Sequence, residues 1–149
     1  MIKVQQESFD VGAEFAKLKG QRKDIGGTAM FVGSVRDISH GADVSAMTLE
    51  HYPGMTEKAL SDIEMEARAR WPLDDVLIIH RYGTLDIGED IVLVITCSAH
   101  REAAFKACEF LMDWLKTKAP FWKLESGSAG PHWVEAKASD DLAAERWIK

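Results

Sequence analysis

The sequence has little that would cross-link the protein or hold it in a membrane. Cys97 and Cys108 are the only cysteines, too few for a disulfide framework, and both fall in apolar segments. No apolar run approaches the roughly 20 residues of a membrane-spanning helix. Residues 1–7 have no apolar core of a signal peptide. We therefore expect a cytoplasmic protein that does not bind membranes and keeps both thiols in its core.

Several kinds of chemistry are also missing. The 18 basic and 24 acidic residues give a net charge of −6, which removes a general electrostatic case for nucleic-acid binding. The five histidines show no metal-ligand spacing, and there is no Walker loop, dinucleotide fingerprint or nucleophile elbow. We expect no metal and no cofactor. A length of 149 residues with 46% hydrophobic and 28% charged residues fits a single domain over residues 1–149.

Strand and helix patterns alternate along the chain, which predicts an α+β fold with a mixed, largely antiparallel sheet and flanking helices. β-Branched and aromatic residues predict strands over residues 26–36, 44–52, 76–82, 91–97, 121–125 and 132–137. Apolar spacing predicts a helix from about Thr56 to Trp71 and a second one from Ser98, as N-cap, to Pro120. Because residues 91–97 are continuously apolar, we expect that strand to be central and covered on both faces.

The start of the second helix carries two basic side chains. With Ser98 as N-cap, His100 and Arg101 fall in the first turn, where positive charge opposes the helix dipole at a typical cost of about 0.3–1 kcal/mol each. Backbone N–H groups, an imidazole and a guanidinium together suit a phosphate or a carboxylate. An exposed turn with a stray arginine explains the same pattern.

A second basic segment follows the end of that helix. Three lysines occur between Asp113 and Glu125 with no acidic residue among them. After the helix the chain should be extended, so that Phe121, Lys123 and Glu125 share one face. A pair of these lysines beside an aromatic wall would bind an anion or activate a carbonyl group. A helix end followed by a solvated strand accounts for the same residues.

Two weaker candidates lie earlier in the chain. Arg36 ends the first predicted strand and precedes a polar loop, a common position for a ligand-binding residue and for an exposed arginine. His51 and Tyr52 would lie near a site, although a strand that ends in a turn explains them too.

Taken together, these segments resemble the large, catalytic subunit of molybdopterin synthase. The matching segments occur in order over roughly residues 26–137, and the ordered set is far more specific than any one motif. They are Gly33-Ser34-Val35-Arg36, Leu49-Glu50-His51-Tyr52-Pro53-Gly54-Met55, His80-Arg81-Tyr82-Gly83, Gly88-Glu89, Ser98-Ala99-His100-Arg101, Leu115-Lys116 and Pro120-Phe121-Trp122-Lys123-Leu124-Glu125.

The resemblance implies an α/β-hammerhead fold and a cytosolic sulfurtransferase. In that family, cyclic pyranopterin monophosphate is converted to molybdopterin by insertion of the two sulfurs of the dithiolene. The sulfur arrives as the C-terminal thiocarboxylate of a small, ubiquitin-like carrier subunit, and a large-subunit homodimer forms the centre of a heterotetramer. A phosphorylated pterin substrate would explain a basic site in an acidic protein, and a sulfur carrier would remove the need for a catalytic cysteine.

The resemblance also implies roles for individual residues. Lys116 and Lys123 match the essential, catalytic lysines. The substrate-binding set that we expect is Ser34, Val35, Arg36, His100, Arg101, Lys116, Lys123, Leu124 and Glu125. Near Lys137 the family pattern leads us to expect an arginine, and a lysine there keeps the charge but loses the bidentate fork.

Two other classes of function stay open at this point. The chain would be a non-catalytic binding module if its lysines only clamp the carboxylate of a ubiquitin-like carrier tail. It would be an unrelated phosphate-ester or acyl-transfer enzyme if it works without any carrier protein.

Helix geometry adds an expectation about assembly. His100 and Lys116 are 16 positions apart in one predicted helix, which separates their backbones by about 24 Å. A pterin monophosphate is much shorter. If both residues touch one substrate, as the resemblance implies, they belong to different protomers. We therefore expect a homodimer with two shared sites, each using Lys116 and Lys123 of one chain and His100 and Arg101 of the other, with Arg36 grouped with the second pair.

Overall fold

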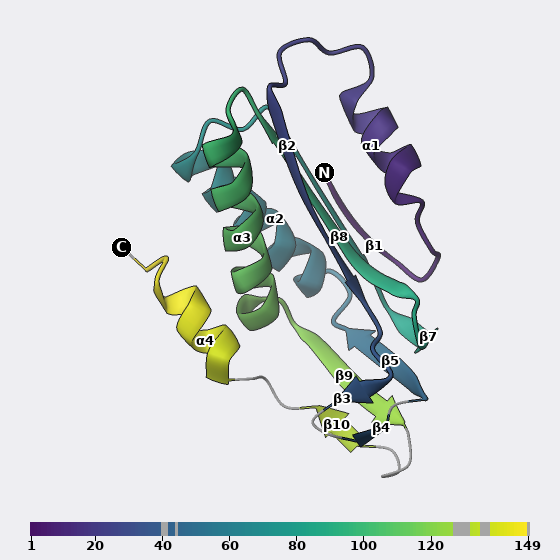
Figure 1. The fold of residues 1–149 in the computed structure, drawn as a ribbon. Helices are drawn as coiled ribbons and strands as arrows, with labels where there is room; N and C mark the ends of the chain where they lie inside the picture. Colours follow the sequence, from purple (N-terminus) through teal and green to yellow (C-terminus); the bar gives the residue numbers. More distant parts are fainter. Residues whose placement is uncertain (40–41, 44, 127–131, 135–137, 149) are drawn as a thin grey trace.

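A four-stranded sheet with helices on both faces forms the main body of the computed structural model, which describes residues 1–39, 42–43, 45–126, 132–134 and 138–148 (Figure 1). The strands stand in the order β1-β6-β8-β2. Strands β1 and β6 run parallel, whereas the β6–β8 and β8–β2 pairs are antiparallel. The bounds are β1 (Ile2–Gln5), β2 (Gly27–Ser34), β6 (Asp75–Arg81) and β8 (Asp90–Ser98).

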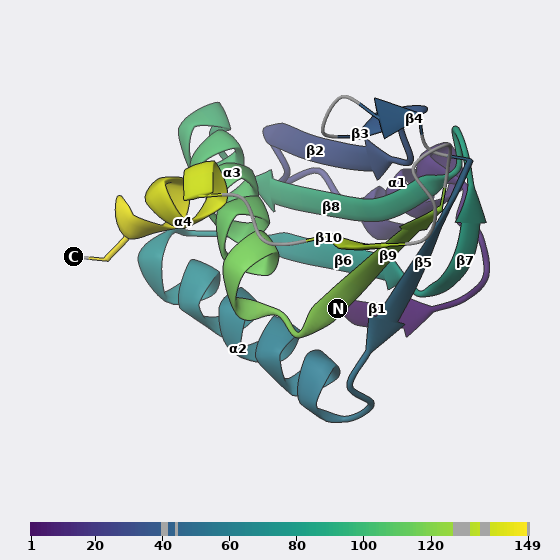
Figure 2. The same ribbon diagram turned by 90° about the horizontal axis from the view of Figure 1, so that it is seen from below.

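Strand β8 is the centre of the core. It lies between β6 and β2, and all its residues from Ile91 to Ser98 are buried. Helix α1 (Val11–Lys19) covers one face of the sheet, and α2 (Met55–Arg70) and α3 (Arg101–Lys118) cover the other (Figures 1 and 2). The predicted central strand, covered on both faces, is therefore confirmed.

A second sheet of four strands packs at one end of the main sheet. Its order is β10-β9-β5-β7, and all its strand pairs are antiparallel. The bounds are β5 (Ala46–His51), β7 (Gly83–Asp86), β9 (Phe121–Ser126) and β10 (His132–Val134). The short strands β3 (Ile38–Ser39) and β4 (Ala42–Asp43) pair with each other, and helix α4 (Ala138–Glu145) packs against α3.

The α+β prediction and the largely antiparallel sheet are confirmed. The predicted helices occur, and the apolar face of α3 is buried at Ala104, Cys108, Leu111 and Leu115. Strand β1 and helix α1 were not predicted, because β1 has four residues and no residue of α1 is fully buried. Among the described residues, no helix is long and apolar enough to cross a membrane.

The predicted N-cap of α3 is wrong. Ser98 is the last residue of β8, where its buried hydroxyl donates to the carbonyl of Pro72 at 2.7 Å. The helix begins at Arg101, and the N-cap is His100, whose extended backbone has φ −130° and ψ 148° and whose side chain caps nothing. A serine hydroxyl donates to a loop carbonyl as readily as it accepts from the N–H groups of a helix N-terminus, so sequence pattern alone misplaced the helix start by two residues.

The turn between α3 and β9 is fastened to the start of α2. Thr56, fully buried, donates its hydroxyl to the carbonyl of Pro120 at 3.0 Å and accepts from the backbone N–H of Tyr52 at 2.9 Å. This one side chain ties the end of β5 to the chain that connects the last turn of α3 with β9.

We expect Thr56→Val to destabilise the protein by about 1–3 kcal/mol, because the substitution keeps the shape but leaves one carbonyl and one N–H group unpaired in the interior. Thr84→Val is the matched control. The exposed Thr84 hydroxyl bonds only that of Thr48, so its loss should cost less than about 0.5 kcal/mol. Urea unfolding measures both, and equal losses would show that Thr56 does not fasten the turn.

Candidate active site

The two predicted catalytic lysines come together at the junction of α3, β9 and the end of β6. Lys116 is exposed on the last turn of α3, and Lys123 lies three residues into β9, partly buried. In the β5–β9 ladder Lys123 stands opposite Leu49, which is 1% exposed. Lys123 therefore leaves the strand beside a buried apolar side chain, where charge interactions are stronger than in water.

A buried histidine lies beneath both lysines. His80, at the end of β6, stacks on Phe121 with ring centroids 3.7 Å apart and an interplanar angle of 17°. Its Nδ1 lies 2.8 Å from the carbonyl oxygen of Arg81. Burial, with smaller contributions from nearby Lys123, Lys116 and His51, lowers the pKa of His80 to about 3, against the opposing effect of the Arg81 hydrogen bond. The imidazole is therefore neutral at physiological pH.

His51 completes the group on the other side. Its ring lies 4.2 Å from that of Tyr82, and its Nε2 is 3.8 Å from Oε1 of Glu57. Glu57 uses its other oxygen to accept from the backbone N–H of Gly54 at 2.6 Å. Of the two residues expected near a site, His51 and Tyr52, the structure places His51 near His80, whereas Tyr52 is exposed.

The charge of Lys116 is not neutralised by the nearest acids of its own helix. Asp113 accepts from Arg146 and from the indole N–H of Trp147, both at 2.7 Å, and Glu109 accepts from Arg146 at 2.5 Å. Among the residues that the structure describes, no carboxylate forms an ion pair with Lys116. The C-terminal end of α3, which carries Lys116, is thus a positively charged region on an acidic protein.

His100 and Arg101 lie at the opposite end of α3. Both are exposed, and the helix N-terminus they occupy has no side-chain cap. Gly26 and Gly27 allow the start of β2 to pass this close: a Cβ on Gly26 would lie 1.9 Å from the carbonyl oxygen of Ala99. Because α3 is unbroken from Arg101 to Lys118, the basic pair is about 24 Å from Lys116 within one chain.

Arg36 lies toward the lysine end of α3 rather than toward its Arg101 end. It follows the end of β2, whereas the first residue of that strand, Gly27, packs against Arg101. Seven residues of extended chain separate the ends by about 23 Å, and β2 and α3 run toward the same end of the molecule (Figure 1). Within one chain, Arg36 therefore lies at the opposite end of β2 from Arg101, toward the end of α3 that carries Lys116.

Ser34 and Val35 hold Arg36 in place. The Ser34 hydroxyl bonds Asp90 Oδ1 at 2.8 Å, and Val35 is 2% exposed in the core of the second sheet. The backbone of Val35 donates to the carbonyl of Glu89 and accepts from Gly88 N–H. The side chains of Ser34 and Val35 therefore contribute to the hydrogen bonding and packing of the fold.

The remaining predicted residues lie in or beyond β9. Leu124 pairs with Thr48 on the face opposite to that of Lys123, and it is partly buried. Glu125 pairs through its backbone with Met47. Lys137 lies outside the described residues.

Both cysteines are core residues, as predicted. Each is buried, and burial raises the pKa of the Cys97 thiol and raises that of Cys108 to about 11. A thiol with a raised pKa is a poor nucleophile at neutral pH. Among the described residues, no cluster of histidines, cysteines and carboxylates could hold a metal ion.

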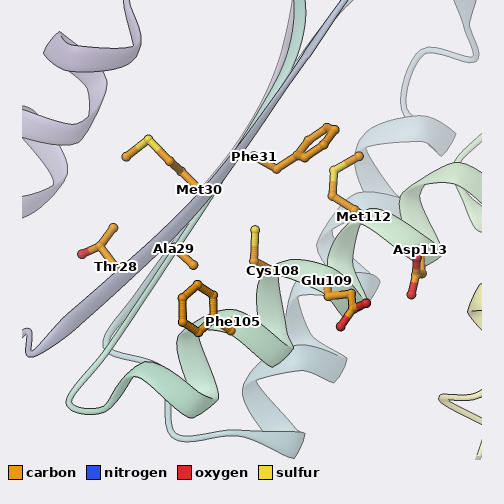
Figure 3. A pocket seen from close by; sticks show the side chains of 9 residues that line it. All are labelled: Thr28, Ala29, Met30, Phe31, Phe105, Cys108, Glu109, Met112 and Asp113. Carbon is orange, nitrogen blue, oxygen red and sulfur yellow. The ribbon is translucent and has the colours of Figure 1, made fainter.

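Sequence analysis missed an apolar groove of about 570 Å³ between β2 and α3. Figure 3 shows the side chains that line it, which include the exposed Met30, Phe31 and Phe105 and the more buried Met112. None of the predicted site residues lines this groove, so it is separate from the cationic cluster.

The buried histidine gives a pH-dependent stability that can be measured. Unfolded His80 takes up a proton near pH 6.5 and the folded residue only near pH 3, so stability should fall as the pH drops from 6.5, by up to about 1.4 kcal/mol per pH unit. In His80→Phe this part of the slope should vanish. Urea unfolding between pH 7 and 5 measures it, and identical slopes in both proteins would rule out a neutral buried His80.

Comparisons with known proteins agree on one family. The sequence model described as MoaE protein matches residues 4–118. The chain is 56% identical to the molybdopterin synthase catalytic subunit of Pseudomonas aeruginosa and 53% identical to that of Escherichia coli strain K12. Each match covers 98% of this chain and 97% of the relative.

Solved structures agree over almost the whole chain. The molybdopterin biosynthesis MoaE protein from Burkholderia ambifaria matches with a TM-score of 0.85 at 51% identity, over 100% of this chain and 98% of that one. Molybdopterin synthase from Staphylococcus aureus matches with 0.82 at 28% identity, over 89% and 96%. A chain from the complex of subunits 1 and 2 of molybdopterin-converting factor from Helicobacter pylori shares the fold, with 0.75 at 18% identity over 91% of each chain. The chain belongs to the MoaE protein family.

Proposed function

We propose that this chain is the catalytic subunit of a molybdopterin synthase. It converts cyclic pyranopterin monophosphate to molybdopterin, with sulfur taken from the C-terminal thiocarboxylate of a small carrier subunit, in the cytoplasm. The observation that carries the proposal is the convergence of Lys116 and Lys123, from separate elements, on the buried His80. The relatives named molybdopterin synthase catalytic subunit supply the activity, and a fold neighbour solved as a complex of two subunits supports a carrier partner.

The geometry of the lysine end suits this chemistry. A thiocarboxylate is an anion, so two ammonium groups and the Arg36 guanidinium attract it, and the partial burial of Lys123 beside Leu49 strengthens the attraction. Lys116, on the exposed helix end, lies beside the incoming carrier tail and the substrate carbon. There its ammonium group stabilises the anionic intermediate, or its deprotonated amine attacks the acyl carbon after the sulfur has bonded to the substrate, so that the acyl–sulfur bond breaks and the thiolate stays on the substrate. Lys123 supplies a second cation.

One reconstitution tests the proposal. The protein is mixed with a thiocarboxylated carrier and the cyclic pterin, and dithiolene product is assayed. Product that depends on both the protein and the thiocarboxylate supports the synthase. Carrier binding without product would instead indicate a non-catalytic binding module, and turnover of a phosphate ester or acyl donor without carrier would indicate an unrelated enzyme.

Lys116→Ala and Lys123→Ala should each fold normally and lose at least about 100-fold in turnover, because each removes a cation from the reacting centre. Lys116→Arg should also lose activity, since it keeps the charge but not the amine. Lys118→Ala, on the same exposed helix turn, is the matched control and should keep its activity. Near-normal turnover by both alanine variants under saturating carrier would remove the catalytic assignment.

A shared site in a homodimer follows from the length of α3. The helix runs without a break from Arg101 to Lys118, so one pterin monophosphate does not reach both ends in a single chain. We assign to each site Lys116, Lys123 and Arg36 of one protomer and His100 and Arg101 of its partner, where the uncapped helix N-terminus holds the phosphate. The dimer forms the centre of a heterotetramer with one carrier at each end.

Mixing two inactive variants tests this arrangement. In a heterodimer of Lys116→Ala with Arg101→Ala, one site carries both lesions and the other is intact. After complete subunit exchange of an equal mixture, activity should return to about a quarter of that of the wild type. Native mass spectrometry verifies the exchange. If heterodimers form and stay inactive, each site belongs to a single chain.

A further inference from the structure

We propose that His80 is a positioning residue of the lysine site: its ring seats Phe121 and thereby sets where Lys123 stands relative to Lys116. The kinetic part of this inference rests on the proposed function. His80 belongs to a segment, residues 80–83, that carries the family resemblance but to which neither the proposed chemistry nor the dimer gives a role.

The contact between His80 and Phe121 is close and well defined. The rings are stacked at 3.7 Å and 17°, and His80 is 5% exposed. Because the Arg81 carbonyl is an acceptor, Nδ1 of His80 must carry the proton of the 2.8 Å hydrogen bond, which fixes the plane of the imidazole. Phe121 therefore packs on a ring that does not turn.

Phe121 lies between Lys116 and Lys123 in the chain, so its position affects the placement of both lysines. It is the first residue of β9, directly after the turn that ends α3, with Lys116 before the turn and Lys123 two residues beyond it. Residues two apart on a strand share a face, so the ring of Phe121 and the side chain of Lys123 leave β9 on the side of His80. A shift of Phe121 would move Lys123 with it.

The neighbours of His80 explain why a neutral ring is needed there. From α3, Lys116 lies near it, from β9, Lys123, and from β5, His51. A permanently positive side chain at this position would repel both lysines, a carboxylate would draw them out of place, and a small apolar one would leave Phe121 without a ring to pack on. A flat, uncharged ring satisfies both requirements.

The alternative is that His80 serves only the stability of the core, and Ile79→Ala provides the matched comparison. Ile79 is the preceding residue of β6, fully buried, and packs with the α1 side of the sheet rather than with Phe121. The Ile79→Ala truncation weakens the core but leaves intact the contact between His80 and Phe121 at the start of β9.

Three variants at the contact separate the ring from the hydrogen bond. His80→Asn keeps a donor near the place of Nδ1 but loses the ring, His80→Phe keeps a ring but loses the donor, and Phe121→Leu removes the other ring. At temperatures where each variant is fully folded by circular dichroism, kcat should fall about tenfold or more in His80→Asn and Phe121→Leu and stay within about threefold in His80→Phe. The double variant His80→Asn/Phe121→Leu should be no slower than either single variant, because both remove one contact.

A measurement without turnover tests the positioning itself. Lysine amines are labelled by reductive ¹³C-methylation, and the NMR signals of Lys116 and Lys123 are assigned with lysine-to-arginine variants. Both signals should shift in His80→Asn and Phe121→Leu and stay in place in His80→Phe and Ile79→Ala. Unchanged lysine signals in His80→Asn, or equal kcat losses in His80→Asn and Ile79→Ala, would overturn the proposal. A wild-type protein that makes no dithiolene would refute the proposed function and leave the NMR result standing.

Discussion

The docking of α3 on β8 is the contact on which the arrangement of the site depends. Ala103, Ala104 and Ala107 are buried, and their small side chains let the helix lie close to the sheet. The buried hydroxyl of Thr96, in the middle of β8, donates to the carbonyl of Ala104 at 2.6 Å. A helix held this way cannot shift along its axis without breaking a buried hydrogen bond. Each end of α3 is therefore a fixed point.

Because both ends of α3 are held in place, the positions of the two groups of basic residues are determined as well. At one end, glycines let β2 pass beside His100 and Arg101. At the other end, the chain leaves the helix through a turn fastened by Thr56 and enters β9 at Phe121. A site that uses both basic groups therefore needs two protomers, because the length and packing of α3 keep these groups apart within one chain.

The sequence was sufficient for those parts of the structure that depend on long periodic patterns. The apolar run of β8 and the spaced apolar residues of α3 indicated a covered strand and an amphipathic helix, and both occur. Lys116 and Lys123 were singled out by the family resemblance, and one short turn separates the elements that carry them in the structure. Ser98 was misplaced because a serine hydroxyl can either donate to a backbone carbonyl, as Ser98 does, or accept from the N–H groups of a helix N-terminus, and the sequence pattern does not distinguish the two. The apolar groove between β2 and α3 could not be predicted from the sequence, because its lining comes from elements far apart in the chain.

The segment His80-Arg81-Tyr82-Gly83 shows why a motif without an evident reaction was hard to interpret. Successive strand residues face opposite sides, so its members serve different parts of the structure. His80 packs on Phe121, whereas the buried guanidinium of Arg81 donates to the carbonyls of Gln6 and Asp90 at 3.0 Å and pairs with Glu89 at 3.3 Å.

The end of the same segment extends this division of tasks to the second sheet. Gly83 has φ +93°, a conformation that favours glycine, and it turns the chain from β6 into β7. Glu89, held by Arg81, accepts from the backbone N–H of Asp86 and uses its own carbonyl to bind Val35 N–H, next to Arg36. These contacts hold the β7–β8 turn against the end of β2. One short stretch of sequence thus supports the lysines from one face and Arg36 from the other, so it contributes to the cationic site without supplying a charge to it.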